Sequence, residues 1–256
     1  MSLARWQAKY VIGGALLLPI APLLWVQGQL TRWKVGVLPG AEGEASGIAG
    51  SSLGKPTKLF VIGESTVAGL GARTHETAFA GQFAKQLSER IGRAVHWQVV
   101  GKNGVTALRT IDELLPYMPD ETFDYILVGL GGNDVMKLSS PKKWRRDMTE
   151  LLGKLRTRNP ESVIFLSNCP MIKYSTAIPH PIKAILWELS QMHDANIKEF
   201  TREMDRVFYY PQPVDVPLDG FFADGIHPSE QGYKDWSAAM MRYFDEHYEW
   251  QHRKSK

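Results

Sequence analysis

The stretch "FVIGESTVAGLG", Phe60 to Gly71, raises the question on which the fold and the chemistry depend. A run of β-forming residues ends at Gly63, and Ser65 follows after one acidic residue. A serine at a strand-to-helix turn can be a nucleophile, or it can cap the helix by accepting a backbone N–H. For a serine considered alone, the cap is the commoner role. Other parts of the chain must therefore distinguish the two roles.

The chain after Lys58 alternates between strand-like and helix-like segments. Strands are predicted at 58–65, 95–102, 123–132, 162–170 and 207–214. Helices are predicted at 76–91, 107–115, 141–158, 182–204 and 227–248. The strands are almost continuously apolar, which is typical of parallel strands buried on both faces. The pattern predicts an α/β fold, a three-layer α/β/α sandwich with a flavodoxin-like, five-stranded parallel sheet.

Four polar clusters follow the predicted strands or lie in loops between elements. They are Gly63–Ser65, Gly101–Ala107, Gly131–Asp134 and Ala223–Pro228. The carboxyl ends of parallel strands lie at one edge of the sheet, and binding sites gather there. Residues that are far apart in the sequence are therefore expected to converge at this edge.

Asp224 and His227 have a spacing that suits serine chemistry. A hydroxyl becomes a good nucleophile only when a base takes its proton and a third group orients that base. Asp224 precedes His227 by three positions in a tight loop that contains glycine. The Asp224 carboxylate can then reach Nδ1 of His227 and leave Nε2 free to face Ser65.

Serine chemistry also needs donors for the oxyanion that forms at the substrate carbonyl. The candidate donors are the amide N–H of Ser65, a backbone N–H in the turn from Gly104 to Ala107, and the side-chain amide of Asn133. Loss of one such donor typically lowers turnover by about 10²–10³. Asp134, the next residue, is expected to be mainly structural.

Three of these clusters resemble the sequence blocks of the SGNH hydrolases, also called the GDSL esterase/lipase family. The blocks are Gly63-Glu64-Ser65-Thr66, Gly131-Gly132-Asn133-Asp134 and Asp224-Gly225-Ile226-His227-Pro228. Their order and spacing agree with the family pattern, over about Lys58 to Tyr248. The resemblance implies that Ser65 is the nucleophile, His227 the general base and Asp224 its orienting partner. It implies no metal and no organic cofactor.

The chain departs from the family pattern at two places. Glu64 stands where the family usually has aspartate, and because that acid lies outside the triad we expect activity to survive. In the second block, the glycine whose amide serves the oxyanion falls at Ala107, and Gly104 marks the preceding turn. A backbone donor tolerates alanine where φ is negative, so one of these two amides is expected to keep the role.

The first part of the chain has a different character. The run "YVIGGALLLPIAPLLWV", Tyr10 to Val26, carries no charge and has basic residues on both sides. As a helix it would span ~26 Å, slightly less than the ~30 Å hydrocarbon layer. It predicts a signal anchor with a cytoplasmic N-terminus. A cleaved signal peptide is one alternative, and a monotopic or kinked insertion around Pro19 and Pro22 is another.

These patterns divide the chain into four segments. Residues 1–35 are expected to be a membrane anchor or uncleaved signal, and residues 36–57 a flexible linker rich in Gly, Ala and Ser. Residues 58–250 are expected to form the hydrolase domain, and residues 251–256 a basic tail. The expected location is a bacterial inner membrane, with the hydrolase domain on the periplasmic side.

The composition argues against several other classes of protein. The 256 residues are 44% hydrophobic and 22% charged, as in an ordinary globular protein. The balance of 30 basic against 27 acidic residues does not predict a nucleic-acid partner. The single cysteine, Cys169, excludes an intrachain disulfide and a cysteine-based zinc site. The spacing of the histidines indicates no metal site.

The motifs predict a serine esterase that hydrolyses a carboxylic ester, whether a lipid, acyl or acetyl ester, through an acyl-enzyme. Three alternatives stay open. The same residues could remove acetyl groups from a carbohydrate, they could transfer an acyl group to another alcohol, or an inactive domain could bind an acylated ligand. The expected partners are a small or lipid ester and a membrane.

Overall fold

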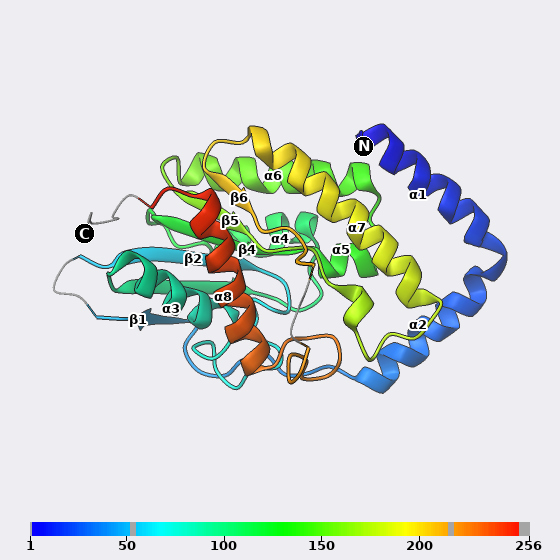
Figure 1. Cartoon of the computed structure of the whole chain (residues 1–256), viewed down its shortest axis with the longest axis horizontal. Helices are drawn as coiled ribbons and strands as arrows, with labels where there is room; N and C mark the ends of the chain where they lie inside the picture. Colours follow the sequence, from blue (N-terminus) through cyan, green and yellow to red (C-terminus); the bar gives the residue numbers. More distant parts are fainter. Residues whose placement is uncertain (1, 52–54, 215–217, 251–256) are drawn as a thin grey trace.

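The computed structural model describes residues 2–51, 55–214 and 218–250, and its centre is a six-stranded sheet (Figure 1). The strand order is β1-β3-β2-β4-β5-β6. The strands are β1 (Ser46–Ala49), β2 (Thr57–Gly63), β3 (Val95–Gly101), β4 (Tyr125–Gly129), β5 (Val163–Leu166) and β6 (Val207–Tyr209). Strands β2 to β6 pair in parallel, whereas β1 is antiparallel to β3. The α/β fold with a mostly parallel sheet is confirmed, but the prediction of five strands misses the antiparallel edge strand.

The missed strand lies within 36–57, the segment predicted to be a flexible linker. Part of this segment is bound to the domain, and for that part the prediction is wrong. Before β1, the amide of Ala41 donates to the carbonyl of Ala68 at 3.0 Å. β1 itself then pairs with β3. An edge strand exposes unpaired N–H and C=O groups, and β1 supplies partners for those of β3.

The composition of β1 hides it from a sequence pattern, and Gly47 shows why. A Cβ atom at Gly47 would lie 2.4 Å from Cζ2 of Trp97 on β3. Glycine therefore allows the indole ring to lie directly against the edge strand. A short strand with glycine at its centre and no large apolar residue on one face resembles a linker.

The side chains of the central strands alternate between two cores, one on each face of the sheet. On β2, Leu59 and Val61 belong to one core, and Phe60 and Ile62 belong to the other. This alternation follows from the period of two along a strand. Residues of α3 (Phe79–Ile91) and α8 (Glu230–His247) complete the first core. Residues of α4 (Ala107–Glu113), α6 (Pro141–Arg158) and α7 (Ile182–Phe200) complete the second.

Two helix starts agree with the sequence signals. The helix predicted at 141–158 is α6, and Ser140 caps it by accepting the amide of Lys143 at 3.3 Å. Ser229 caps α8 by accepting the amide of Gly232 at 3.1 Å. Both α8 and α3, however, begin three residues later than the predicted helices at 227–248 and 76–91. The residues before α3 form a turn in which the amides of Thr77 and Ala78 donate to the carbonyl of Thr74.

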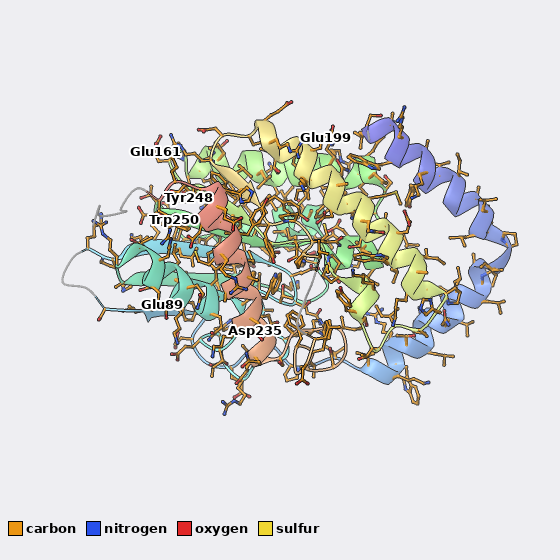
Figure 2. The ribbon with its side chains drawn as sticks, viewed as in Figure 1. Glu89, Glu161, Glu199, Asp235, Tyr248 and Trp250 are labelled. Carbon is orange, nitrogen blue, oxygen red and sulfur yellow. The ribbon has the colours of Figure 1, made fainter. Side chains whose placement is uncertain are left out.

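The end of the domain is held by aromatic packing. Figure 2 shows Tyr248 and Trp250 side by side beyond the C-terminal end of α8, and their ring centroids are 4.7 Å apart. Trp250 is buried in the first core. The predicted basic tail, 251–256, lies outside the described residues.

The N-terminal segment is helical from Leu3 to Val35, with a break. It consists of α1 (Leu3–Leu17), a 3₁₀ turn (Leu18–Ile20) and α2 (Ala21–Val35), which lie beside α7 in Figure 1. The break falls at Pro19, which has no N–H to continue an α-helix. Within the described residues, this is the one helical stretch long and apolar enough to cross a membrane, and none of its most apolar window is buried. It is consistent with a signal sequence or an anchor.

Candidate active site

The site lies where β2 and β4 end, beside the loop that precedes α8. β2 ends at Gly63, directly opposite Gly129 at the end of β4. A Cβ atom at Gly63 would lie 2.0 Å from the carbonyl oxygen of Gly129, so glycine is required for the two strand ends to approach. The chain then enters a series of turns rather than a helix, and α3 begins only at Phe79. The alternative that Ser65 caps a helix is therefore not supported.

Ser65, His227 and Asp224 form one hydrogen-bonded chain. Oγ of Ser65 lies 3.1 Å from Nε2 of His227, although 162 positions separate the two residues. Nδ1 of His227 lies 2.8 Å from Oδ2 of Asp224. Ser65 is 7% exposed. The three residues expected to converge are thus in contact, with each ring nitrogen facing the predicted partner.

The loop from Asp224 to His227 fixes its own geometry. The second carboxylate oxygen, Oδ1 of Asp224, accepts the amides of Ile226 at 2.8 Å and of His227 at 2.7 Å. Burial of Asp224 disfavours its ionisation, but the hydrogen bonds from His227 and from these amides outweigh burial, and the pKa of Asp224 lies below its ordinary value. The carboxylate beside the imidazole is therefore ionised at neutral pH.

Glu64, which the sequence interpretation left without a role, connects Ser65 to the block at Gly131–Asp134. Its Oε1 accepts the amide of Gly132 at 2.6 Å. Its Oε2 accepts the backbone amide of Asn133 at 2.7 Å and the side-chain Nδ2 at 2.5 Å. A Cβ atom at Gly132 would lie 2.9 Å from Oε1, so a larger residue there would push the carboxylate away from these amides. The only sequence signal for this contact is that an acidic residue immediately precedes the serine.

The environment of Glu64 moves its pKa in the opposite direction from that of Asp224. Burial is the largest cause and disfavours the charged form, whereas the amides of Asn133 and Gly132 favour it. The balance raises the pKa of Glu64 from 4.5 to about 7. The group that holds Asn133 in place is therefore close to its titration point at neutral pH.

The predicted oxyanion donors differ in how they are used. One Nδ2 hydrogen of Asn133 is taken by Glu64, and the other is left for a ligand. The amides of Ser65 and Gly104 donate to no acceptor in the described parts of the chain. The amide of Ala107, however, donates to Oδ2 of Asp134 at 2.9 Å in a buried contact, so the prediction for Ala107 is wrong.

Asp134 has the structural role expected of it. It is fully buried, and besides the amide of Ala107 it accepts the hydroxyl of Ser139 at 3.1 Å. Asp134 lies within the short helix α5 (Gly132–Met136), so these bonds join α5 to the start of α4 and to the segment that follows α5. A buried aspartate needs hydrogen-bond donors for its stabilisation. Because Asp134 takes the amide of Ala107, that amide is not free to bind a substrate oxyanion.

A cavity of about 260 Å³ lies beside the hydrogen-bonded chain. Its wall includes both sequence neighbours of Ser65 and both neighbours of His227, although not the two residues themselves. Most of the remaining wall is apolar or aromatic, and it includes Leu130, Met171, Tyr174, Tyr210, Phe221, Phe222 and Trp236. Asp235, which Figure 2 places on the first turns of α8, and Arg242 add charge to the wall.

The cavity corrects the interpretation of one aromatic residue. Trp236 falls in the apolar stripe of the last helix, and this periodicity by itself predicts a core residue. Its ring does stack on Phe79 at 4.2 Å, but it also lines the cavity, and its Nε1 donates to Oδ1 of Asn168 at 2.7 Å. Periodicity could place Trp236 on the buried face of the helix but could not show an empty space beside it.

Two other sequence interpretations concern metals and thiols. Within the described ranges, no group of three or more His, Cys, Asp or Glu side chains could hold a metal ion. Cys169 is buried, and burial raises the pKa of its thiol well above the ordinary value. A buried thiol of this kind is protonated and behaves as a small apolar side chain.

A hydroxyl, an imidazole and a carboxylate in one hydrogen-bonded chain, at the carboxyl edge of a parallel sheet, are the arrangement that serine hydrolases use. The model of the GDSL-like Lipase/Acylhydrolase family matches residues 61–234, which is more than half of the chain. The chain belongs to this family of ester hydrolases, as the sequence blocks predict.

The chain is also similar to individual proteins. The GDSL-like esterase Rv1075c of Mycobacterium tuberculosis is 25% identical over 191 residues, which are 68% of this chain and 57% of that protein. The chain thus matches little more than half the length of that relative. The lipase Lip_vut3 from a goat rumen metagenome has a TM-score of 0.59 at 16% identity, over 73% of this chain and 96% of the lipase. A carbohydrate esterase of family 2 from Corynascus thermopiles has a TM-score of 0.54 at 15% identity, over 79% of this chain and 69% of that one. The two structures share the fold.

Proposed function

We propose that the protein is a serine esterase in which Ser65, His227 and Asp224 form the catalytic triad. The observation that carries this proposal is the contact of 3.1 Å between Oγ of Ser65 and Nε2 of His227. Membership of a family of lipases and acylhydrolases supports an ester as the substrate. The ionised Asp224 supports the role of His227 as base, because its charge stabilises the imidazolium that forms.

In the first half of the reaction, Oγ of Ser65 attacks the carbonyl carbon of the ester while its proton moves to Nε2 of His227. The bond to the leaving oxygen then breaks, and the proton on Nε2 passes to that oxygen, which leaves as the alcohol. The acyl group stays on Ser65. Asp224 keeps Nδ1 of His227 protonated throughout, so that Nε2 is the nitrogen that exchanges the proton.

The negative charge on the carbonyl oxygen needs donors at the moment it forms. The amide of Ser65 and the remaining Nδ2 hydrogen of Asn133 are two such donors, and the amide of Gly104, which has no acceptor among the described residues, is the third. In this arrangement Glu64 touches no reacting atom. It is a positioning residue that holds Asn133 against the oxyanion.

In the second half of the reaction, water takes the place of the alcohol. His227 removes a proton from the water as the oxygen attacks the acyl carbon, and the proton then returns to Oγ of Ser65 as the acid leaves. Transfer to another alcohol would follow the same steps with that alcohol in place of water. Product analysis with a competing alcohol distinguishes hydrolysis from transfer.

The proposal is tested by Ser65→Ala with a short-chain aryl ester. We expect kcat/KM to fall by about 10⁴ or more, because the variant lacks the hydroxyl that forms the acyl-enzyme. Ser51→Ala, a change at an exposed serine, is the matched control and should keep full activity. Circular dichroism shows whether the fold is intact. A folded Ser65→Ala protein that retains turnover would contradict the proposal.

The apolar cavity favours an ester with a longer acyl chain over an acetyl ester. Each methylene group that leaves water for an apolar wall gains about 0.8 kcal/mol, or about a fourfold gain in kcat/KM. We therefore expect kcat/KM to rise with acyl chain length until the cavity of about 260 Å³ is filled. This expectation distinguishes the esterase from a carbohydrate O-deacetylase, whose acetyl group needs no such space.

A substitution in the wall tests where the acyl chain binds. Ala238 lines the cavity on α8, and Ala238→Phe would fill part of it. We expect this variant to lose at least about tenfold in kcat/KM with the best long-chain ester and to keep its activity on an acetyl ester. Equal loss on both esters would mean that the acyl chain binds elsewhere.

We also propose that the N-terminal helices attach the protein to a membrane. The run from Tyr10 to Val26 has no charged residue, and none of the residues from Val11 to Val26 is buried. A water-exposed surface of this kind is unfavourable. Sedimentation of the full chain with membranes, and its resistance to washing at high pH and high salt, tests the attachment. Full recovery in the soluble fraction would contradict it.

A further inference from the structure

We propose that α1 and α2 form a bent pair of helices, here called the hairpin, whose bend enters one leaflet of a lipid bilayer, with both ends of the pair on the side of the catalytic domain. This inference specifies the membrane attachment proposed above and rests on it, but it does not depend on the ester chemistry. It decides among the three interpretations of the N-terminal run in favour of a kinked, monotopic insertion.

The residues that precede the apolar run are bound to the catalytic domain. Trp6 is 5% exposed and is packed with Val135, Leu186 and Leu189 in a third apolar cluster. The hydroxyl of Tyr10 donates to the carbonyl of Leu138 at 2.7 Å.

Two polar contacts hold the same part of α1. Oε1 of Gln7 accepts the amide of Lys142 at 3.1 Å, at the start of α6. Lys9 forms an ion pair with Glu188 of α7. The first leg of the hairpin therefore begins on the surface of the domain.

The residues that follow the apolar run are bound to the same domain. Nε2 of Gln27 donates to the carbonyl of His180 at 2.7 Å. A Cβ atom at Gly28 would lie 3.7 Å from Cδ1 of Ile182, the first residue of α7. If the run crossed a bilayer, its two ends would lie on opposite sides of a ~30 Å layer. They could not then both be in contact with one domain.

The basic residues support the same topology. Arg5 and Lys9 precede the run, and Arg32 and Lys34 follow it. A helix that crosses a membrane normally has its excess of basic residues at one end. In a hairpin both ends lie at the same surface, where the exposed side chains of Arg5 at one end and of Arg32 and Lys34 at the other can contact anionic headgroups.

The bend between the legs is suited to hydrocarbon. Figure 1 shows that α1 and α2 meet at a bend at the edge of the molecule. Across the bend, the amide of Leu18 donates to the carbonyl of Ala15, and the amide of Ala21 donates to that of Leu18. Pro19 and Pro22 have no N–H that would need a partner. These two bonds and the two prolines reduce the number of backbone donors at the bend that would lack a partner in lipid.

The dimensions fit one leaflet. From Tyr10 to Pro19 the helical rise is ~13 Å, which is close to half of the ~30 Å hydrocarbon layer. Leu16 and Leu23, on the two legs near the bend, are 75% and 72% exposed. Trp25 and Trp33 on α2 are exposed as well, and tryptophan favours the headgroup region. A bilayer is thus the occupant that matches the length, the apolar surface and the aromatic residues.

The hairpin would also place the catalytic site near the membrane surface. The cluster that buries Trp6 includes Val135 of α5, and Ile226, the residue before His227, is packed against that cluster. The base of the hairpin therefore adjoins the rim of the site. Esters that partition into a bilayer would be close to Ser65.

The topology can be measured with single cysteines in the full chain, because the native Cys169 is buried. The positions are Ser2→Cys before the run, Gln29→Cys after it, and Lys234→Cys on the domain, all exposed. We expect a membrane-impermeant maleimide to label all three from the same side of sealed vesicles. Labelling of Ser2→Cys from the side opposite to Gln29→Cys and Lys234→Cys would overturn the hairpin and leave the attachment standing.

The insertion of the bend has its own test. We expect Leu16→Asp combined with Leu23→Asp to lower the membrane-bound fraction by about tenfold or more, because charged residues are excluded from hydrocarbon. Tyr117→Asp, at an exposed aromatic residue of the domain, is the matched control and should stay bound. Activity on a soluble ester shows that each variant is folded.

An unchanged bound fraction in the double variant would overturn the insertion, and so would a stable soluble dimer of the full chain. Cleavage of residues 1–35 would overturn both the attachment and the hairpin, whereas ester hydrolysis would remain.

Discussion

Two carboxylates at the same edge of the sheet, Asp224 and Glu64, have opposite environments. Asp224 faces the ring of His227, which can carry a positive charge, and its pKa is lowered. Glu64 is buried among the neutral amides of Gly132 and Asn133, and its pKa is raised to about 7. The comparison teaches that the role of an acid here depends on its partner. One orients the base, and the other holds a donor for the oxyanion.

The largest effect should come from Asp224→Asn. The amide oxygen of asparagine would keep accepting the backbone amides of Ile226 and His227, so its NH₂ would face Nδ1 of His227 in place of Oδ2. An NH₂ donates and carries no negative charge, so the ring takes the wrong tautomer and the imidazolium is not stabilised. We expect kcat to fall by about 10⁴ with little change in KM. Steady-state kinetics on an aryl ester gives both constants. A loss smaller than that in Glu64→Gln would reverse the roles assigned to the two acids.

A smaller effect is expected from Glu64→Gln. The side-chain NH₂ of glutamine would face the donors of Gly132 or Asn133, and Asn133 would lose its fixed position. We expect kcat to fall by about 10², as for the loss of one oxyanion donor. The double variant with Asn133→Ala should be no slower than Asn133→Ala alone, because the two residues act as one unit. Independent, additive losses would show that Glu64 acts by another route.

The two acids should also differ in how they link stability to pH. The folded-state pKa of Glu64 is raised from 4.5 to about 7, so its contribution to the free energy of unfolding is fully present below pH 4.5 and is lost as the pH rises to about 7. The expected loss over this window is about 3 kcal/mol. Denaturant unfolding at several pH values should show it as a change in the difference between the wild type and Glu64→Gln, because buried His193, whose pKa is lowered to about 4, contributes the opposite pH dependence to both proteins.

Glu89→Gln, at the exposed glutamate labelled in Figure 2, is the control and should keep the wild-type dependence. The same pH dependence in Glu64→Gln as in the wild type would mean that Glu64 is ionised throughout this range.

The smallest effect is expected from Glu64→Asp, which keeps the charge but shortens the side chain. The carboxylate would reach the amides of Gly132 and Asn133 less closely, and we expect kcat to fall by less than about tenfold. Rescue relative to Glu64→Gln would support a positioning role for the charge. If aspartate were as slow as glutamine, the length of the side chain would be the decisive property.

The sequence predicted the parts of the fold and site that depend on side-chain type and spacing. Apolar runs predicted the five parallel strands, and the placement of polar clusters after them brought Ser65 and His227 to one edge. The strand β1 was missed because glycine is not a typical strand residue. Gly47 is explained only by its close contact with the ring of Trp97 on β3, and this contact exists only in the folded protein.

The oxyanion donors could not be predicted in the same way. The amide of Ala107 can face either the site or Asp134, depending on the direction of one peptide group. The residue type at position 107 does not determine this direction. The cavity was equally hidden, because its wall joins Met171, Tyr210 and Trp236 from three separate segments. Contacts of this kind arise from the packing of loops and have no periodic signal.

The central claim, that His227 activates the hydroxyl of Ser65, is tested most directly by a fluorophosphonate probe followed by peptide mass analysis. The probe reacts with an activated serine and leaves its phosphonyl group on that oxygen. We predict one adduct, on Ser65, that is absent in Ser65→Ala and forms far more slowly in His227→Ala. An adduct on another serine, or equal labelling with and without the imidazole, would contradict the account.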